Sequence, residues 1–188
     1  MKNQIFQTIA MHRRMLDNLE ANSVKTIEDA ANTIIKSLEK GGTLYICGNG
    51  GSAADAQHIA GEFIGRFLRE RKALLAVALS TDTSVITCVG NDYSFEDIFA
   101  RQAEGLIKKQ DCLWALSTSG SSPNVVKAAN IAKERGAKVI PFTGRKNSRL
   151  EKIADVCLCA EADKTFAVQE IHQIAYHIIC DLVERHFT

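Results

Sequence analysis

The stretch TLYICGNGGS, residues 43–52, decides the fold, because a short uncharged and mostly apolar run is followed in it directly by a glycine-rich segment. Residues 43–47 have the β-branched and aromatic character of a strand that is buried on both faces. The glycines that follow let the backbone turn sharply and approach a ligand closely. Ser52 can cap the next helix, whose first amides favour an anion. The stretch therefore predicts a buried strand followed by either a tight structural turn or a phosphate-binding turn.

Downstream of this stretch, further short apolar runs have the same strand character, and helical patterns separate most of them. They are residues 74–79, 112–116, 138–142 and 156–159. Apolar strands that alternate with helices indicate a parallel sheet covered by helices on both faces. The sequence thus predicts a doubly wound α/β core over residues 42–188.

Upstream, the chain shows two helical stripes of apolar side chains, at residues 5–19 and 24–38. Ser23 is a suitable cap for the second helix, and Gly41 with Gly42 is a suitable stop. We therefore expect an N-terminal helical hairpin over residues 1–41, which would serve packing or oligomerisation. Together with the α/β core it makes a single domain of 188 residues.

The composition is that of an ordinary globular chain, with 46% hydrophobic residues, 24% charged residues and a net charge of +1. It argues against disorder, and the absence of a basic footprint argues against nucleic acid as a partner. The locally basic run Arg66–Lys72 fits a solvated helix end. An amphipathic N-terminus predicts neither a signal peptide nor a membrane partner. Six cysteines without a disulfide framework or common zinc spacing indicate reduced thiols and a cytoplasmic location.

A second polar loop, Ser117–Pro123, directly follows the expected strand at residues 112–116. Pro123 suits the first position of a helix, with Ser122 as its cap. Five hydroxyl groups and several free amides then gather at one helix N-terminus, which favours phosphate binding by neutral donors. Capping alone needs only one of these hydroxyls, so the loop predicts a phosphate site. Neither polar loop has the pattern of a nucleoside triphosphate loop or a full dinucleotide fingerprint.

An acid–base constellation occupies the helix that is expected to begin near Ser52. His58, Glu62 and Arg66 recur at steps of four residues and so would share one face. A carboxylate and an imidazole suit proton abstraction beside a carbonyl group, and both bind divalent metals. Glu62 with Arg66 alone would be a surface ion pair. The constellation, one helix away from a phosphate-type loop, indicates a catalytic or metal site.

The last helix combines a broad apolar stripe, within residues 171–183, with a polar row on the opposite side. The row consists of Gln169, Gln173 and His177, at steps of four residues. In a monomer this row would face water, whereas two amides and an imidazole can line a site. Gln169 and His177 are therefore the expected partners of the acid–base constellation.

Five motifs in this order resemble the signature of the phosphoheptose isomerases of the sugar isomerase (SIS) fold. They are CGNGGSAADAQH at residues 47–58, TDTS at 81–84, GND at 90–92, STSG at 117–120, and QEIH at 169–172 followed by His177. The resemblance extends from about residue 3 to residue 186, and so covers nearly the whole chain. One of these motifs alone would be weak evidence, whereas five at matching spacing are specific.

The resemblance implies a five-stranded parallel sheet of the flavodoxin-like sandwich type, and a homotetramer with active sites between subunits. It implies conversion of sedoheptulose 7-phosphate to D-glycero-D-manno-heptose 7-phosphate through an enediol, for heptose in surface polysaccharides. Glu62 and His177 would be the acid–base pair. Some members of the family carry zinc at the matching set, which here is His58, Glu62, Gln169 and His177. The residues implied around the phosphosugar are Asn49, Gly50, Gly51, Ser52, Arg66, Asn91, Asp92, Ser117, Thr118, Ser119, Ser122 and Gln169.

One departure from the family lies two residues before Gln169, where an arginine is usual and this chain has Ala167. The lost cation leaves open an isomerase that acts on another phosphosugar. A further alternative is a non-catalytic member of the fold that binds sugar phosphates as a regulator or adaptor. Loss of the acid–base residues would signal such a protein, but Glu62 and His177 are both present, so the sequence favours an enzyme. Whether zinc would assist turnover or hold a resting form stays open, because a ligand cannot freely exchange protons.

Overall fold

The computed structural model describes residues 1–188 and contains one sheet of five strands, all paired in parallel. The strand order is β2-β1-β3-β4-β5, and each strand overlaps its expected apolar run. The doubly wound parallel sheet is therefore confirmed. The bounds are β1 Leu44–Gly48, β2 Ala76–Ala78, β3 Cys112–Ser117, β4 Lys138–Thr143 and β5 Leu158–Cys159.

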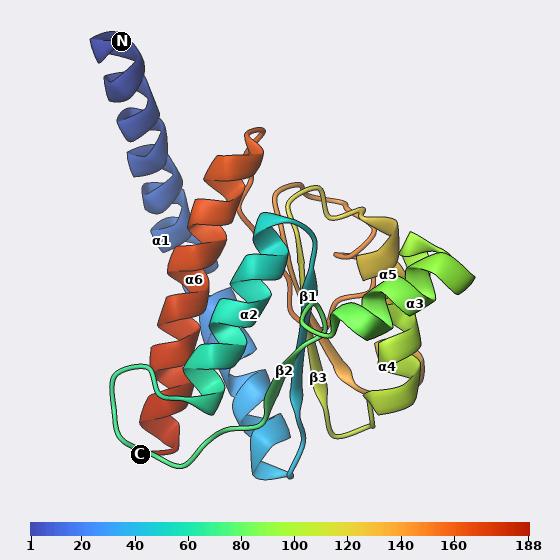
Figure 1. Cartoon of the computed structure of the whole chain (residues 1–188). Helices are drawn as coiled ribbons and strands as arrows, with labels where there is room; N and C mark the ends of the chain where they lie inside the picture. Colours follow the sequence, from blue (N-terminus) through green and yellow to red (C-terminus); the bar gives the residue numbers. More distant parts are fainter.

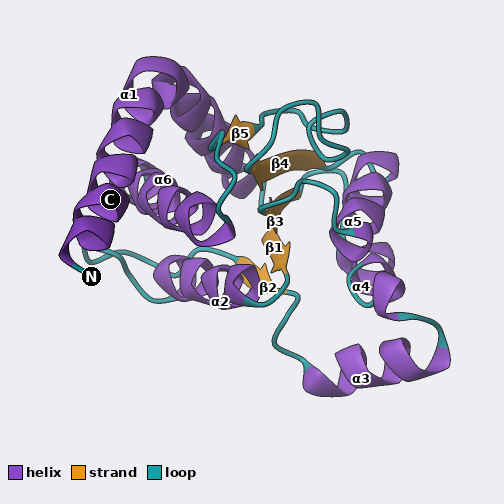
Figure 2. Cartoon of the chain, turned by 90° about the horizontal axis from the view of Figure 1, so that it is seen from above, coloured by secondary structure: helices purple, strands orange, loops and turns teal.

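Helices cover both faces of the sheet (Figure 2). One layer holds α1 (Lys2–Glu39), α2 (Gly51–Ile64) and α6 (Thr165–His186), and the other holds α3 (Thr83–Asp92), the 3-10 helix η1 (Phe95–Asp97), α4 (Ala100–Leu106) and α5 (Pro123–Glu134). Alternate residues of β1 face the two cores: Leu44 and Ile46 pack with the first layer, whereas Tyr45 and Cys47 pack with the second. No helix combines the length and the apolar character that crossing a membrane requires.

The expected N-terminal hairpin is wrong, because a single helix of 38 residues, α1, spans this region. No glycine or proline occurs between residues 2 and 39 to interrupt it. Ser23, the expected cap, lies inside α1 and is buried. The two apolar stripes are in phase, since Leu19, Ser23 and Ile27 follow one another at steps of four residues. They form one face, which packs against α6.

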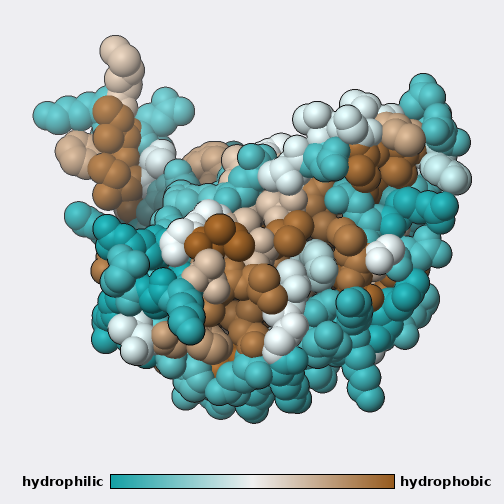
Figure 3. All heavy atoms as spheres, turned by 60° about the horizontal axis from the view of Figure 1, so that its bottom comes forward, coloured by the Kyte–Doolittle hydropathy of each residue, from teal (hydrophilic) through white to brown (hydrophobic).

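The first turns of α1 project beyond the rest of the molecule (Figure 1). Ile5, Phe6 and Ile9 are each at least 45% exposed in this part of the helix. Figure 3 shows an apolar strip along the same projecting part, at the upper left. This apolar surface has no partner within the chain.

α6 buries only part of the apolar stripe expected for it. Ile174, Ile178 and Leu182 are between 37% and 41% exposed. Because α1 and α2 both pack against α6, its buried face is rotated to include His172 and Tyr176. The sequence pattern could not show this rotation, since a polar and an aromatic residue take the buried positions.

α2 ends at Ile64, so the expected extension of its polar face to Arg66 is wrong. The guanidinium group of Arg71 donates to carbonyl oxygens of the last helical turn, including that of Glu62 at 2.6 Å. These bonds satisfy carbonyls that a longer helix would use. Arg66 lies beyond this end, and its exposed side chain pairs with Glu70 at 3.9 Å.

The carboxyl ends of β1 and β3 lie side by side at the centre of the sheet. Gly48, the last residue of β1, pairs with Leu116 of β3. From β1 the chain continues to β2 on one side, and β3 lies on the other, so this is the switch point of the topology. Ligands of doubly wound sheets bind at such a point.

Candidate active site

Two polar loops meet at the switch point, namely residues 49–51 after β1 and residues 118–122 after β3. The side-chain amides of Asn49 and Asn124 join them, because each donates to the carbonyl oxygen of the other at 2.8 Å. Asn124 is 2% exposed, so this reciprocal pair lies in the interior. It ties the turn after β1 to the first turn of α5.

The hydroxyl groups of the loop after β3 gather at the start of α5. The Oγ of Ser117 lies 2.9 Å from that of Ser122 and 3.3 Å from that of Ser119. Ser122 is the N-cap residue, as expected, but its hydroxyl contacts Ser117 instead of bonding to an amide of α5. Pro123 has no N–H, and the amide of Val125 donates to Oδ1 of Asn124 at 2.9 Å, so the amide of Asn124 is the one in the first turn of α5 that can bind an anion together with the hydroxyls.

Two glycines shape the turn after β1. Gly50 has a φ of +54°, in the left-handed region that favours glycine. A Cβ atom on Gly51 would lie 2.2 Å from Nε2 of Gln169. The amide of Gln169 therefore lies directly against the start of α2, and it brings α6 to the phosphate-type turn.

α2 and α6 bring together the expected acid–base residues. Nε2 of His58 lies 3.0 Å from Oε1 of Glu62, one turn further along α2. The imidazole rings of His58 and His177 lie 5.0 Å apart between centroids. One possible ligand atom from each of these residues lies within 4.8 Å of the others. Ligands of a tetrahedral zinc ion lie about 3.4 Å apart, so small side-chain rotations would fit this set to zinc.

Gln169, the fourth expected ligand, bonds to a residue behind this cluster. Its Nε2 donates to Oδ2 of Asp55 at 3.0 Å, which leaves its Oε1 as the atom for a ligand. The hydroxyl of Tyr176 lies 3.5 Å from Oδ1 of the same carboxylate and 3.1 Å from Nδ1 of His58. Sequence reasoning missed Asp55 and Tyr176. The available signals were the position of Asp55, three residues before His58, and a tyrosine within an apolar stripe.

Aromatic rings surround His177. The ring of Phe67 stacks on it, with centroids 5.5 Å apart and an interplanar angle of 15°. Burial, and next the neighbouring His58, lower the pKa of His177 below its ordinary value, although Glu62 acts in the opposite direction. The ring is therefore uncharged near neutral pH and can accept a proton.

The segment that carries Phe67 is anchored to the end of α6 by Glu184. The carboxylate of Glu184 accepts hydrogen bonds from the backbone amides of residues 67–69 at 2.7–2.8 Å. Nε of Arg71 lies 3.5 Å from the same carboxylate, and both side chains are at most 2% exposed. Burial works to raise the pKa of Glu184, but the amides and Arg71 outweigh it and lower the pKa. This anchor holds the Phe67 ring against His177.

Asn91 and Asp92, which were expected at the sugar, are not brought to this cluster within one copy of the chain. Nδ2 of Asn91 donates to Oδ1 of Asp92 at 2.8 Å, at the end of α3. Figures 1 and 2 both show α3 on the far side of the sheet from α2 and α6. Their role in binding sugar hydroxyls stays a prediction, as does that of the exposed Arg66.

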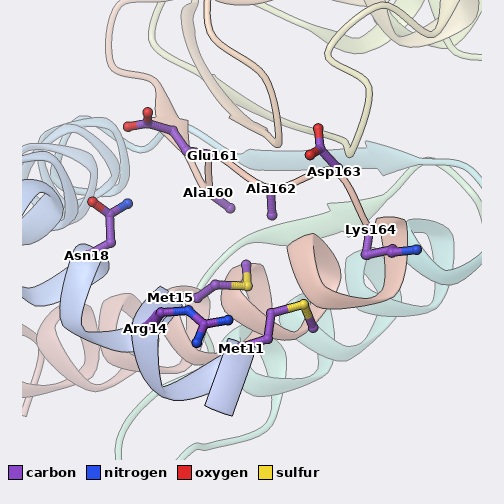
Figure 4. Close-up of a pocket in the computed structure, with 9 residues that line it drawn as sticks. All are labelled: Met11, Arg14, Met15, Asn18, Ala160, Glu161, Ala162, Asp163 and Lys164. Carbon is purple, nitrogen blue, oxygen red and sulfur yellow. The ribbon is translucent and has the colours of Figure 1, made fainter. Parts of the chain in front are cut away.

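A cavity of about 500 Å³ lies apart from the acid–base cluster, between α1 and the segment that leads into α6 (Figure 4). Neither the cluster nor the two polar loops contribute to its walls, so its volume does not mark the catalytic site. Its lining residues are Met11, Arg14, Met15, Asn18, Ala160, Glu161, Ala162, Asp163 and Lys164.

Comparison with known proteins shows the same similarity in sequence and in fold. The SIS domain family matches residues 9–144. A phosphoheptose isomerase of Helicobacter pylori is 44% identical over 177 residues, which cover 94% of this chain and 92% of the relative. A phosphoheptose isomerase of a Nitratiruptor species is 42% identical over 187 residues and covers 100% of both chains. The structure of phosphoheptose isomerase GmhA from Neisseria gonorrhoeae superposes with a TM-score of 0.92 at 37% identity, covering 98% of each chain.

Proposed function

This chain belongs to the phosphoheptose isomerases of the SIS domain family and is a sugar-phosphate isomerase, and we propose that it converts sedoheptulose 7-phosphate to D-glycero-D-manno-heptose 7-phosphate. The observation that carries this proposal is the cluster of His58, Glu62 and His177 beside two phosphate-type loops. Aldose–ketose isomerisation needs an anchor for the phosphate and a proton carrier at two adjacent carbons. The product supplies heptose for surface polysaccharides.

Glu62 is the carbon base in this proposal, and its side chain is 20% exposed, so a substrate can reach it. The carboxylate removes a proton from C1 of the open-chain ketose. The electron pair of that C–H bond forms the C1=C2 double bond of an enediol as O2 gains a proton. The carboxylate then returns its proton to C2 while O1 loses one and becomes the aldehyde oxygen. His177, uncharged near neutral pH, carries the proton between the two oxygens.

The phosphate group is assigned to the two loops at the switch point. Hydroxyls of the Ser117–Ser122 loop and the backbone amide of Asn124 provide neutral donors, and the helix dipole favours the anion. The turn at residues 49–52 approaches from β1, held by the Asn49–Asn124 pair. These donors bind substrate and transition state alike, so they act as an anchor.

The same cluster is proposed to bind one zinc ion per subunit, through His58, Glu62, Gln169 and His177. The donor types and the 4.8 Å limit on the spacing of three of the ligand atoms support this. Bound zinc would either polarise a substrate oxygen as a Lewis acid or hold a resting form, because Glu62 and His177 cannot exchange protons freely while they bind the ion. Elemental analysis of protein purified without chelator is expected to give about one zinc per chain, the stoichiometry of a single site. A metal-free protein that takes up no zinc on titration and stays fully active would contradict the zinc site and leave the isomerase proposal intact.

The proposed working form is a cytoplasmic homotetramer of single SIS domains, each formed by the whole chain. The exposed apolar residues of α1 and α6 support an assembly, because a monomer would leave them in water. The polar row of Gln169, Gln173 and His177 supports active sites near subunit contacts, since catalysis requires protection from bulk water.

Ala167 favours a second candidate, an isomerase of a different phosphosugar. Ala167 is completely buried at the start of α6. Alanine carries no charge, so the chain has no cation at the position where phosphoheptose isomerases usually have an arginine. Incubation with sedoheptulose 7-phosphate and with other ketose phosphates, followed by proton NMR for an aldehyde or anomeric product signal, separates the candidates. We expect turnover of the seven-carbon substrate. Turnover of a shorter ketose phosphate alone would select the second candidate, and binding without turnover of any would indicate a regulator.

A further inference from the structure

A chain of buried polar groups lies behind the acid–base cluster, and the proposed mechanism does not use it. The Tyr176 hydroxyl lies 3.1 Å from Nδ1 of His58 and 3.5 Å from Oδ1 of Asp55. Oδ2 of Asp55 accepts a hydrogen bond from Gln169 at 3.0 Å. Tyr176 is 0% exposed and Asp55 is 7% exposed. One interior carboxylate therefore connects to two of the four proposed metal ligands.

We propose that Asp55 and Tyr176 are positioning residues, which orient His58 and Gln169 for the reaction and for the metal. The inference rests on the proposed function in one respect, namely that His58 and Gln169 belong to the active site. Neither Asp55 nor Tyr176 would touch the substrate, and each would act through the residue that it holds.

The Tyr176 hydroxyl selects which nitrogen of His58 faces the site. Because Nδ1 is engaged by the hydroxyl, Nε2 is the nitrogen directed to Glu62, at 3.0 Å. A hydroxyl both donates and accepts, so it serves either state of the ring. It donates to Nδ1 when Nε2 carries the proton. When Nε2 binds a metal, it accepts from Nδ1–H and donates onward to Asp55, the arrangement in which an outer carboxylate fixes a metal-bound histidine.

The Asp55 carboxylate selects which atom of Gln169 faces a ligand. An ionised carboxylate only accepts hydrogen bonds, so it must face the Nε2 amide of Gln169 and not Oε1. The oxygen is thereby left for a metal or a sugar hydroxyl. An asparagine at this position could donate instead, and Gln169 would then turn its amide over.

Packing alone does not explain these two polar groups. Tyr176 occupies a buried position on α6, as Ala175 and Ile179 do, where a phenylalanine would fill nearly the same volume. A buried hydroxyl or carboxylate costs free energy unless it is bonded. Asp55 forms no ion pair with a lysine or arginine, and its side-chain partners are Gln169 and Tyr176. The contribution of the Asp55 carboxylate and the Tyr176 hydroxyl is therefore their hydrogen bonding to the site residues Gln169 and His58.

The test compares Tyr176→Phe and Asp55→Asn with the control Tyr45→Phe. Tyr45 is also a buried tyrosine with a hydrogen-bonded hydroxyl, but it lies in the other core and bonds to the carbonyl oxygen of Leu106. Zinc affinity is measured by competition with a chromogenic chelator, kcat and KM by the isomerase assay, and the His58 Nδ1 resonance by ¹⁵N NMR of metal-free protein. Thermal unfolding confirms that each variant is folded.

We expect both test variants to bind zinc about 10–100-fold more weakly and to lose a similar factor in kcat, with KM nearly unchanged. Tyr176→Phe should also shift the His58 Nδ1 resonance, whereas the control changes none of these quantities. Unchanged zinc affinity, kcat and His58 resonance in a folded Tyr176→Phe protein would overturn the proposal. The proposal would also be overturned if the control Tyr45→Phe produced the same losses of zinc affinity and kcat. Because the NMR shift needs neither zinc nor turnover, it tests the Tyr176–His58 contact even if the isomerase assay of the wild type is silent, in which case the proposed function fails separately.

Discussion

His172 and His177 lie on the same helix, and their surroundings give them opposite properties. His172 is 0% exposed, with Nε2 lying 3.0 Å from the carbonyl oxygen of Thr143 and Nδ1 without a partner. Burial lowers the pKa of His172 to about 4, although the Thr143 carbonyl acts in the opposite direction. His172 is thus a neutral interior ring that joins α6 to β4. His177, half-buried and beside Glu62, remains available for chemistry.

Acid should therefore destabilise the fold through His172. The unfolded chain binds a proton to this side chain below about pH 6.5, whereas the folded chain does so only below about pH 4. Stability from this residue is complete above pH 6.5 and is lost as the pH falls toward 4, in total about 3 kcal/mol. Urea unfolding of the wild type and His172→Gln at several pH values in this window measures the difference. If the free energy of unfolding changed with pH in the same way for the wild type and for His172→Gln, His172 would not be the group that causes the loss of stability in acid.

At the scale of elements, the loop between β3 and α5 is the proposed anion site at a strand end. Parallel pairing brings the loop beside the turn after β1, and the hydroxyls of Ser117, Ser119 and Ser122 converge at the start of α5. The Ser122 hydroxyl contacts Ser117 and caps no amide of α5, which supports the proposed role of the loop in phosphate binding.

Ser119→Ala and Ser122→Ala should each raise KM for the phosphosugar about 10-fold, because each removes a hydrogen bond to a charged group. Such donors bind ground state and transition state alike, so kcat should change little. Ser121→Ala is the matched control, since the Ser121 hydroxyl lies in the same loop but, unlike those of Ser119 and Ser122, does not bond to Ser117. Steady-state kinetics separate the two constants, and a large fall in kcat at constant KM would argue against an anchoring role.

The elements differ in how far sequence could predict them. The strands and the two polar loops were predictable because apolar runs and small polar residues mark them locally. The continuity of α1 was concealed by Ser23, which suits a cap in isolation but lies on the face packed against α6. The end of α2 depends on Arg71, which follows it in an irregular segment. Asp55 and Tyr176 acquire their role only when α2 and α6 meet, which no local pattern contains.

The whole molecule presents apolar surface that its own chain does not cover. The projecting part of α1 exposes Ile5 and Ile9, and α6 exposes Ile174, Ile178 and Leu182. Asn91 and Asp92 lie away from the cluster of His58, Glu62 and His177. Their motif could not predict this, because a sequence motif gives the residue types but not the position at which α3 packs.

Assembly should fail when charge is placed on the projecting part of α1. The double variant Ile5→Asp with Ile9→Asp introduces unpaired charges into the proposed contact, whereas Leu106→Asp, at a 45% exposed position on α4 in the other layer, is the control. Sedimentation velocity should show a tetramer for the wild type and the control, and smaller species for the double variant. A wild type that sediments as a stable, active monomer would exclude the tetramer.

The central claim is that Glu62 transfers the carbon-bound proton. Its most direct test is the turnover number of Glu62→Gln on sedoheptulose 7-phosphate, with Glu104→Gln, a half-exposed carboxylate in the other layer, as the control. A general base typically contributes about 10²–10⁴-fold, so kcat should fall by at least that lower factor in a protein that unfolds at the wild-type temperature. Wild-type turnover in folded Glu62→Gln would contradict the account.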